Sequence, residues 1–287
     1  MTFTLLASAF ALIASAAPAT ASAAPATAST APATQPAEPQ PTHHEVEVTP
    51  GKTVAYLVTE PRRPTVAKDR WMLVFLHGAG GSLKGYNLSR PPYAKIRAAL
   101  AENGAYVVVP ALGGVHFMND EAKDSLTKVI DRVAADYQID PKRVHLMGTS
   151  MGAGSSLAYA VNRPDRVRSV CAIMPMTDFA EWAAQSPKYA ERLKVAYGGT
   201  PEEKPEAYDA NSALKNVNTF AKIPVLLVHG AADKTVPVSH SEKLAAALKA
   251  KGYRCTLIVT DGAHKDDIVT DVQDEIAEFL IDANTNK

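Results

Sequence analysis

The sequence predicts an α/β fold in which a mostly parallel sheet of about eight strands is covered by helices on both faces and carries a small helical cap insertion. Three observations support this prediction. Short apolar runs alternate with helical patterns along the chain. Several of the runs are continuously apolar, which is typical of strands buried on both faces. Strands that alternate with helices imply right-handed crossovers, and such crossovers produce a parallel sheet.

The strands of this sheet are predicted from apolar and alternating segments. Residues 45–49 and 53–59 alternate in character around Pro50 and Gly51, which indicates an antiparallel hairpin at the start of the sheet. The remaining strands are expected over residues 71–76, 106–109, 143–147, 167–174, 225–228 and 255–260.

The helices are predicted from apolar residues at helical spacing. They are expected over residues 92–103, 120–137, 153–160, 239–251 and 268–280. Ser239 and Glu242 have the spacing of a capping box, and Gly252 follows as a helix stop. The interval 175–222 breaks the alternation with helical pieces at 179–184 and 189–197. We interpret this interval as a small cap over the site, with a plain surface excursion as the alternative.

The composition indicates one globular domain without strong charge. The chain has 287 residues, of which 30 are basic and 30 are acidic, and 46% are apolar. A formal net charge of zero provides no field that would recruit nucleic acid or an acidic membrane surface. Residues 43–287 have a length that suits a single large α/β domain, and we expect a monomer.

The N-terminal segment indicates export. Residues 5–17 form an apolar run too short to span a membrane, and the small residues at 21–23 fit a signal-peptidase site. We therefore predict a signal peptide over residues 1–23 and a secreted or periplasmic protein with no integral membrane segment after cleavage. No Lys or Arg precedes the apolar run, so a disordered alanine-rich tail is the alternative. Residues 24–42, rich in Ala, Pro and Thr, predict a disordered spacer.

The two cysteines are expected to remain unbridged. Cys171 and Cys255 fall on predicted strands that a third strand separates. Two strand spacings amount to about 9.6 Å, which is beyond the reach of a disulfide. We therefore predict two free, buried thiols.

A serine motif follows the strand predicted at 143–147. Gly148, Ser150 and Gly152 form a Gly-x-Ser-x-Gly pattern that leads directly into a helix of small residues. Glycines at these positions leave room for a strained strand-to-helix turn that exposes the serine hydroxyl. The Met151 N–H, at the N-terminus of the helix, would then point at the group that the serine attacks. The pattern alone also fits an ordinary strand–turn–helix junction.

An acid and a histidine follow two later strands, so that the chain order is Ser150, Asp233, His264. Asp233 comes just after the strand at 225–228, and His264 follows the strand at 255–260. A serine hydroxyl needs a base to take its proton and a carboxylate to orient that base. Asp178, which follows another strand, is the alternative acid. We expect Asp266 and Asp267 to cap the final helix, because they follow His264 too closely to orient it.

The region from about residue 71 to 280 resembles the serine esterases of the α/β-hydrolase fold. The motifs at 76–81 (LHGAGG), 148–152 (GTSMG), 224–237 (PVLLVHGAADKTVP) and 261–264 (DGAH) are similar to those of its prolyl-oligopeptidase-like and polyhydroxybutyrate-depolymerase-like (feruloyl esterase) branches. The resemblance implies that Ser150 is the nucleophile, His264 the base and Asp233 the acid. It also implies a second oxyanion donor, from Ala79 or Gly80, beside the Met151 N–H.

The remaining site predictions concern the pocket and other histidines. The residues expected to line an acyl or alcohol pocket, with core packing as the alternative, are His116, Phe117, Met118 and Trp182. His77 and His229 each precede a glycine at a strand end, and we expect hydrogen-bonded structural histidines there. No cluster of residues indicates a metal site, and we expect neither a metal ion nor an organic cofactor.

These observations predict a serine carboxylesterase that acts on a small or polymeric ester through an acyl-enzyme on Ser150. A serine peptidase of the prolyl-oligopeptidase-like type is one alternative, although no propeller domain precedes the hydrolase region and no acidic pair for a peptide amino terminus is evident. A non-catalytic binding member of the fold is another alternative, which the presence of Ser150, Asp233 and His264 disfavours.

Overall fold

The computed structural model describes residues 39–63, 65–83 and 89–285. The predicted signal peptide and residues 24–38 of the predicted spacer lie outside the described residues. Strands β1 (Thr42–Thr49) and β2 (Lys52–Thr59) form the predicted antiparallel hairpin. The first strand begins at Thr42, which places the last residue of the predicted spacer inside the sheet.

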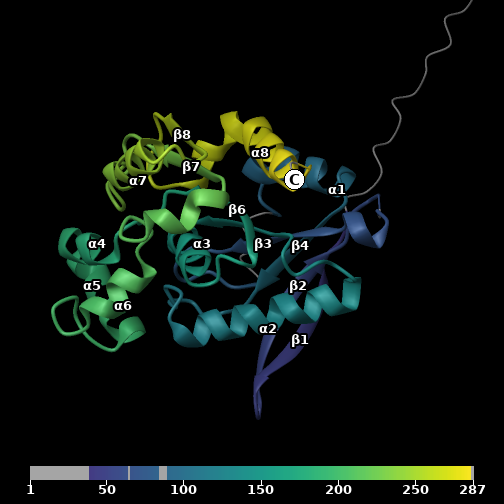
Figure 1. Cartoon of the computed structure of the whole chain (residues 1–287), viewed down its shortest axis with the longest axis horizontal. Coiled ribbons are helices and arrows are strands. Elements are labelled where there is room, and N and C mark those ends of the chain that lie inside the picture. The colour runs from purple at the N-terminus through teal and green to yellow at the C-terminus, as the bar shows by residue number, and fades with distance from the viewer. Residues whose placement is uncertain (1–38, 64, 84–88, 286–287) are drawn as a thin grey trace, which may run out of the picture. The chain divides into compact units, whose positions relative to one another are not determined.

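The sheet has eight strands in the order β1-β2-β4-β3-β5-β6-β7-β8 (Figure 1). Strand β2 of the hairpin pairs antiparallel with β4, and the neighbouring pairs among the other six strands are parallel. The six parallel strands are β3 (Trp71–Leu76), β4 (Ala105–Pro110), β5 (Val144–Thr149), β6 (Val167–Ile173), β7 (Val225–Gly230) and β8 (Cys255–Thr260). The predicted, mostly parallel α/β-hydrolase sheet is therefore confirmed.

Helices cover both faces of the sheet because side chains alternate between the faces along each strand. In β3, Met72 and Val74 belong to one apolar core, and Leu73 and Phe75 belong to the other. Three helices pack on the first core, namely α2 (Asp120–Tyr137), α3 (Met151–Asn162) and α7 (Ser239–Ala250). Two helices, α1 (Ala94–Glu102) and α8 (Gln273–Thr285), lie side by side on the second core (Figure 1).

The excursion between β6 and β7 forms the helices α4 (Phe179–Gln185), α5 (Pro187–Tyr197) and α6 (Pro205–Asn211), followed by a 3-10 segment, η5 (Val217–Lys222). Helix α6 was not expected from the sequence, since its stretch is polar and too short to show a helical period. Only Tyr208 and Asn211 of this helix are buried. Two buried residues are too few to form an apolar stripe at helical spacing, so the sequence pattern did not predict this helix.

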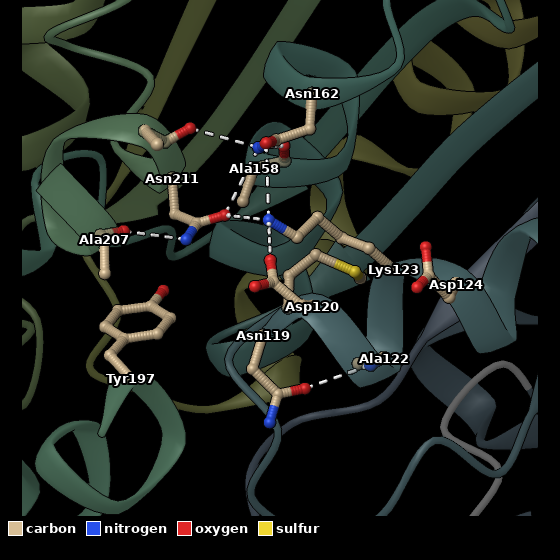
Figure 2. Close-up of polar contacts among 12 residues, drawn as sticks. Asn119, Asp120, Ala122, Lys123, Asp124, Ala158, Asn162, Tyr197, Ala207 and Asn211 are labelled. Carbon is tan, nitrogen blue, oxygen red and sulfur yellow. Dashed lines mark hydrogen bonds and ion pairs between the residues drawn. The ribbon is translucent and has the colours of Figure 1, made fainter.

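A buried lysine joins this excursion to the main domain (Figure 2). The Lys123 ammonium on α2 donates to Asn162 Oδ1 on α3 and Asn211 Oδ1 on α6, both at 3.3 Å. It also forms a 2.8 Å ion pair with Asp120. Asn162 donates in addition to the Ala210 carbonyl at 3.0 Å. These contacts connect α2, α3 and α6 through polar groups that are mostly buried.

Three details of the C-terminal half differ from prediction. The capping box at Ser239 does not form, because Val238 is the N-cap residue and its carbonyl accepts the Glu242 N–H at 3.1 Å. The predicted final helix begins as the 3-10 segment η6 (Asp266–Val272) and continues as α8. Cys171 and Cys255 are free, with β7 between their strands, but Cys255 is only half-buried. None of the helices in the described ranges is long and apolar enough to cross a membrane.

Candidate active site

Ser150 occupies a strained turn between β5 and α3. Its φ of 52° and ψ of −118° lie outside the conformations common for residues with a side chain. The two motif glycines make the turn possible. A Cβ on Gly148 would overlap the backbone of Gly152, and a Cβ on Gly152 would overlap the Leu76 carbonyl. The Ser150 N–H donates to the Ile173 carbonyl at 2.8 Å and fixes the turn against β6.

The three residues predicted to form the catalytic centre lie in one hydrogen-bonded chain. Ser150 Oγ is 2.8 Å from His264 Nε2, and His264 Nδ1 is 2.6 Å from Asp233 Oδ2. A carboxylate accepts, so the Nδ1 atom carries the proton and Nε2 accepts from the serine hydroxyl. The His264 side chain is 19% exposed, whereas that of Asp233 is fully buried. The histidine therefore reaches solvent and the carboxylate does not.

Asp233 is held as a carboxylate by its surroundings. Burial by itself raises the pKa of Asp233, but hydrogen bonds from His229, His264 and the Val236 N–H outweigh burial and hold this pKa well below its usual range. The second carboxylate oxygen, Oδ1, accepts the N–H groups of Thr235 and Val236, each at 2.9 Å. A negative charge at this buried position is therefore stabilised at neutral pH.

Close packing between two loops brings the acid and the base together. A Cβ on Gly230, at the end of β7, would overlap the Gly262 carbonyl. The Ala232 N–H donates to the Gly262 carbonyl at 3.0 Å, and the Ala231 N–H donates to the Thr260 carbonyl at 2.7 Å. The loop after β7 and the loop after β8 are thereby fixed to each other just before Asp233 and His264.

The structure distinguishes the two candidates for the second oxyanion donor. The Gly80 N–H already donates to the Gly114 carbonyl at 2.6 Å. Ala79 lies in the wall of the cavity that contains Ser150. The Met151 N–H stands at the first residue of α3, directly after the serine. The Gly80 N–H is therefore engaged between two loops, which leaves Ala79 as the candidate to consider beside Met151.

A cavity of about 430 Å³ opens beside Ser150 and His264. Its walls come from the loop after β3, the turn that follows β6, the excursion helix α5 and the loop after β8. The residues in these walls include Ala79, Arg90, Pro92, Met174, Tyr189, Lys265, Asp266 and Asp267. The Tyr189 ring stacks on Trp182, with 4.7 Å between the ring centroids. The cavity thus has a mixed aromatic and charged lining.

The four predicted pocket residues do not line this cavity, and that prediction is wrong. Phe117 and Met118 are fully buried in the core, and His116 is buried at 5% exposure. Burial, followed by the effect of His77, lowers the pKa of His116 to about 3. Trp182 lies behind Tyr189, where its indole N–H donates to the Thr235 carbonyl at 3.0 Å. The core-packing alternative therefore holds for Phe117, Met118 and Trp182, whereas His116 lines a separate cavity.

The cavity residues that the sequence analysis missed carried weak signals. Arg90, Tyr189 and Lys265 lie outside any recognised motif, and Asp266 was expected only to cap the final helix. Their positions depend on how loops after different strands meet. The proximity of Lys265 and Asp266 to the histidine in sequence was the one usable sign.

The other titratable candidates have structural roles. Asp178 is the N-cap of α4, where Oδ1 accepts the N–H groups of Ala180 and Glu181 at 3.1 Å each. His229 lies between Ser241 Oγ, at 2.7 Å from Nδ1, and the Val236 carbonyl, at 2.9 Å from Nε2. The expectation of structural histidines is met at this position. Asp266, which was expected to cap the final helix, instead forms an ion pair with Arg90 at 2.5 Å.

Comparison with known proteins identifies the family. The model of the prolyl oligopeptidase family matches residues 100–283, well over half of the chain. The chain belongs to the prolyl oligopeptidase family. It accordingly has the α/β-hydrolase fold, and the resemblance to the prolyl-oligopeptidase-like branch is confirmed.

Relatives within and around this family are distant. An "Uncharacterized peptidase YtmA" of Bacillus subtilis is 26% identical over 69% of this chain and 76% of its own length. An "Inactive dipeptidyl peptidase 10" of Rattus norvegicus is 30% identical over 51% of this chain but only 18% of its own length. An "Uncharacterized protein YfhR" of Escherichia coli is 29% identical over 56% of this chain and 53% of its own length.

Solved structures share the fold. A "Pyrococcus horikoshii acylaminoacyl peptidase" has a TM-score of 0.69 and 18% identity, and the match covers 85% of this chain and 41% of that one. A "mycobacterium tuberculosis puromycin-hydrolyzing peptidase" has a TM-score of 0.70 and 18% identity, with 87% and 40% covered. The chain thus spans less than half the length of these two proteins.

Proposed function

We propose that this protein hydrolyses carboxylic esters through an acyl-enzyme formed on Ser150. The observation that carries the proposal is the hydrogen-bonded chain from Asp233 through His264 to Ser150, at the wall of an open cavity. As Ser150 Oγ attacks the ester carbonyl, His264 Nε2 takes its proton. The Asp233 carboxylate keeps the imidazole in the required tautomer and stabilises the imidazolium that forms.

The second half of the reaction uses the same groups. The N–H groups of Met151 and Ala79 would donate to the oxyanion of the tetrahedral intermediate. The imidazolium returns its proton to the departing alkoxide, which leaves as the alcohol. His264 then takes a proton from water, the hydroxide attacks the acyl-enzyme, and the proton passes to Ser150 Oγ as the carboxylic acid departs.

A peptidase is the second candidate, and family membership is the observation that favours it. The same relay can protonate a departing amine. Several proteins similar to this chain are named as peptidases, including the acylaminoacyl peptidases whose fold it shares. Similar proteins of Rattus norvegicus and Mus musculus are named as inactive, so a non-catalytic role is one of the outcomes that the following experiment distinguishes.

The decisive experiment compares esters and amides with the same acyl group. The full chain and Ser150→Ala would be assayed on p-nitrophenyl esters from acetate to decanoate and on the matching p-nitroanilides. We expect ester hydrolysis by the wild type and a loss of about three orders of magnitude or more in the variant. A higher kcat/KM on the anilides would favour the peptidase. No difference between wild type and variant on either series would exclude both enzyme proposals.

We also propose that the protein is exported, because its first 23 residues have the length and apolar run of a signal peptide. The N-terminus of the protein recovered from the medium or periplasm would test this proposal. A new N-terminus close to residue 24 is expected. Retention of the whole chain inside the cell would contradict it.

A further inference from the structure

One wall of the serine cavity presents a fixed guanidinium group. Arg90 lines the cavity together with Ser150 and His264. Its side chain is 56% exposed, so the guanidinium reaches the solvent of the cavity. Arg90 precedes the turn η4 (Pro91–Tyr93), whose Pro92 lines the same wall. The two prolines that follow stiffen the backbone at this position.

A buried carboxylate holds this guanidinium in place. Arg90 Nη1 donates to Asp266 Oδ2 at 2.5 Å, and the Asp266 side chain is only 8% exposed. Burial, followed by the nearby Asp266 charge, raises the pKa of the buried Tyr93 well above its usual range. A carboxylate buried to this degree requires its cationic partner. Arg90 is therefore fixed in the cavity wall before any substrate arrives.

The remaining donors of Arg90 can bind a further acceptor. A guanidinium has five N–H groups in a planar fork, and Asp266 Oδ2 is the one side-chain acceptor that the described residues place on it. The free edge of the fork matches the two oxygens of a carboxylate. Because the side chain is already ordered by Asp266, binding costs little additional side-chain entropy.

Three other charged side chains lie in the cavity wall with Arg90. Lys265 contributes a second positive charge to the wall, and Asp266 and Asp267 contribute two negative charges. Asp266 is already paired with Arg90. Lys265 and Asp267 are both exposed, so solvent screens their charges. The group with a fixed position and directed donors is the guanidinium.

We propose that Arg90 forms a carboxylate-binding subsite of the serine cavity, so that the enzyme prefers substrates with a free carboxylate near the bond that is cleaved. This proposal rests on the proposed function in that Ser150 performs the cleavage. Half-esters of dicarboxylic acids have this chemistry in the acyl part. Esters of hydroxy acids have it in the leaving group.

Hydrolysis assays test the preference and identify the half of the substrate that carries the charge. The p-nitrophenyl half-ester of adipic acid would be compared with p-nitrophenyl hexanoate, and the hexanoate ester of 4-hydroxybenzoate with phenyl hexanoate. We expect Arg90→Met to lower kcat/KM for one anionic substrate by roughly 10- to 100-fold, the loss typical of one charge-assisted hydrogen bond. The neutral partner of that substrate should change by less than threefold. Equal effects of Arg90→Met on charged and neutral substrates would overturn the proposal.

Matched variants separate this role from general charge and stability effects. Arg132 has a side chain 55% exposed and one carboxylate partner, Asp136, so Arg132→Met is the control for Arg90→Met and should leave the preference intact. Arg90→Lys keeps the charge but loses the fork, and it should restore only part of the preference. If Arg90→Met unfolds because Asp266 is left unpaired, Arg90→Met combined with Asp266→Asn removes both charges and should show the same loss.

A binding experiment keeps this proposal distinguishable from the hydrolase proposal. Ser150→Ala has no nucleophile and cannot form an acyl-enzyme, so binding of monomethyl adipate and of methyl hexanoate to it can be measured by titration calorimetry or NMR. We expect the anion to bind at least tenfold more tightly, and Arg90→Met in this background to abolish the difference. Anion binding through Arg90 in a protein that hydrolyses no substrate would support the subsite and refute the hydrolase. Equal binding of both ligands would refute the subsite even if hydrolysis is observed.

Discussion

The acid of the proposed relay is defined by its hydrogen bonds more than by its position after a strand. Asp233 receives two backbone N–H groups on one oxygen and His264 on the other, with His229 close by at 3.4 Å. Asp178 also follows a strand, but its carboxylate caps α4. Hydrogen bonding thus gives two acidic residues of similar placement in sequence different roles.

Replacing Asp233 by Asn should lower kcat by about four orders of magnitude, because the amide favours the wrong tautomer of His264. Ester hydrolysis at pH 7.5 would be measured for this variant. Asp178→Asn is its matched control and should stay within a few-fold of wild type. A large loss in Asp178→Asn with little change in Asp233→Asn would reassign the acid.

Gly152→Ala should destabilise the fold by about 2 kcal/mol, because overpacking against a fixed backbone group is costly. The new Cβ would overlap the Leu76 carbonyl on the central strand β3. Urea unfolding followed by circular dichroism would measure the change. Gly78→Ala is a suitable control, since a Cβ there has no neighbour nearer than 3.6 Å. Equal stability of the two variants would contradict this explanation of the motif glycine.

At the scale of elements, Lys123 and Trp182 are two of the side chains that join the excursion between β6 and β7 to the rest of the domain. Its helix α6 is held by the Lys123 cluster, which connects it to α2 and α3 (Figure 2). Its helix α4 is held by Trp182, whose indole donates to Thr235 beside Asp233. The ring of Tyr189 in the cavity wall stacks on that tryptophan. The cavity wall and the acid loop are therefore linked through one buried side chain.

Lys123→Met should loosen α6 without unfolding the sheet. The substitution leaves the buried amide oxygens of Asn162 and Asn211 with fewer donors, at a cost of about 1–3 kcal/mol. Hydrogen exchange by mass spectrometry should show faster exchange over residues 205–211 and unchanged protection in β5. The exposed Lys128 on the same helix gives the control variant Lys128→Met. Unchanged exchange in α6 would show that apolar packing alone holds it.

At the scale of the whole molecule, buried histidines connect stability to pH. Burial, as the largest cause, lowers the pKa of His116 and His145 to about 3 and that of His240 to about 4. Each of these side chains is neutral in the folded protein. In the unfolded chain each would take up a proton below about pH 6.5.

The free energy of unfolding should therefore decrease as the pH falls from about 6.5 toward 4, because the unfolded state binds more protons there. Each histidine contributes a slope of up to about 1.4 kcal/mol per pH unit. Urea unfolding at several pH values between 4.5 and 7.5 would measure the total slope. His145→Gln removes one of these titrating groups and should reduce the slope by up to about 1.4 kcal/mol per pH unit. A free energy of unfolding that is constant over this range would contradict the proposed cause.

The sequence by itself determined the strands, most helices and the three residues of the hydrogen-bonded chain. These features depend on local patterns, namely the side-chain period, glycines at forced turns and the strand ends that a parallel sheet brings to one edge. Only the tertiary structure decided the cavity lining, the choice of Ala79 over Gly80 and the helix α6. Arg90 and Asp266 are far apart in sequence, and their contact depends on how two loops pack. The periodic spacing of apolar residues carries no information about a contact between two loops, so this ion pair could not be predicted from the sequence.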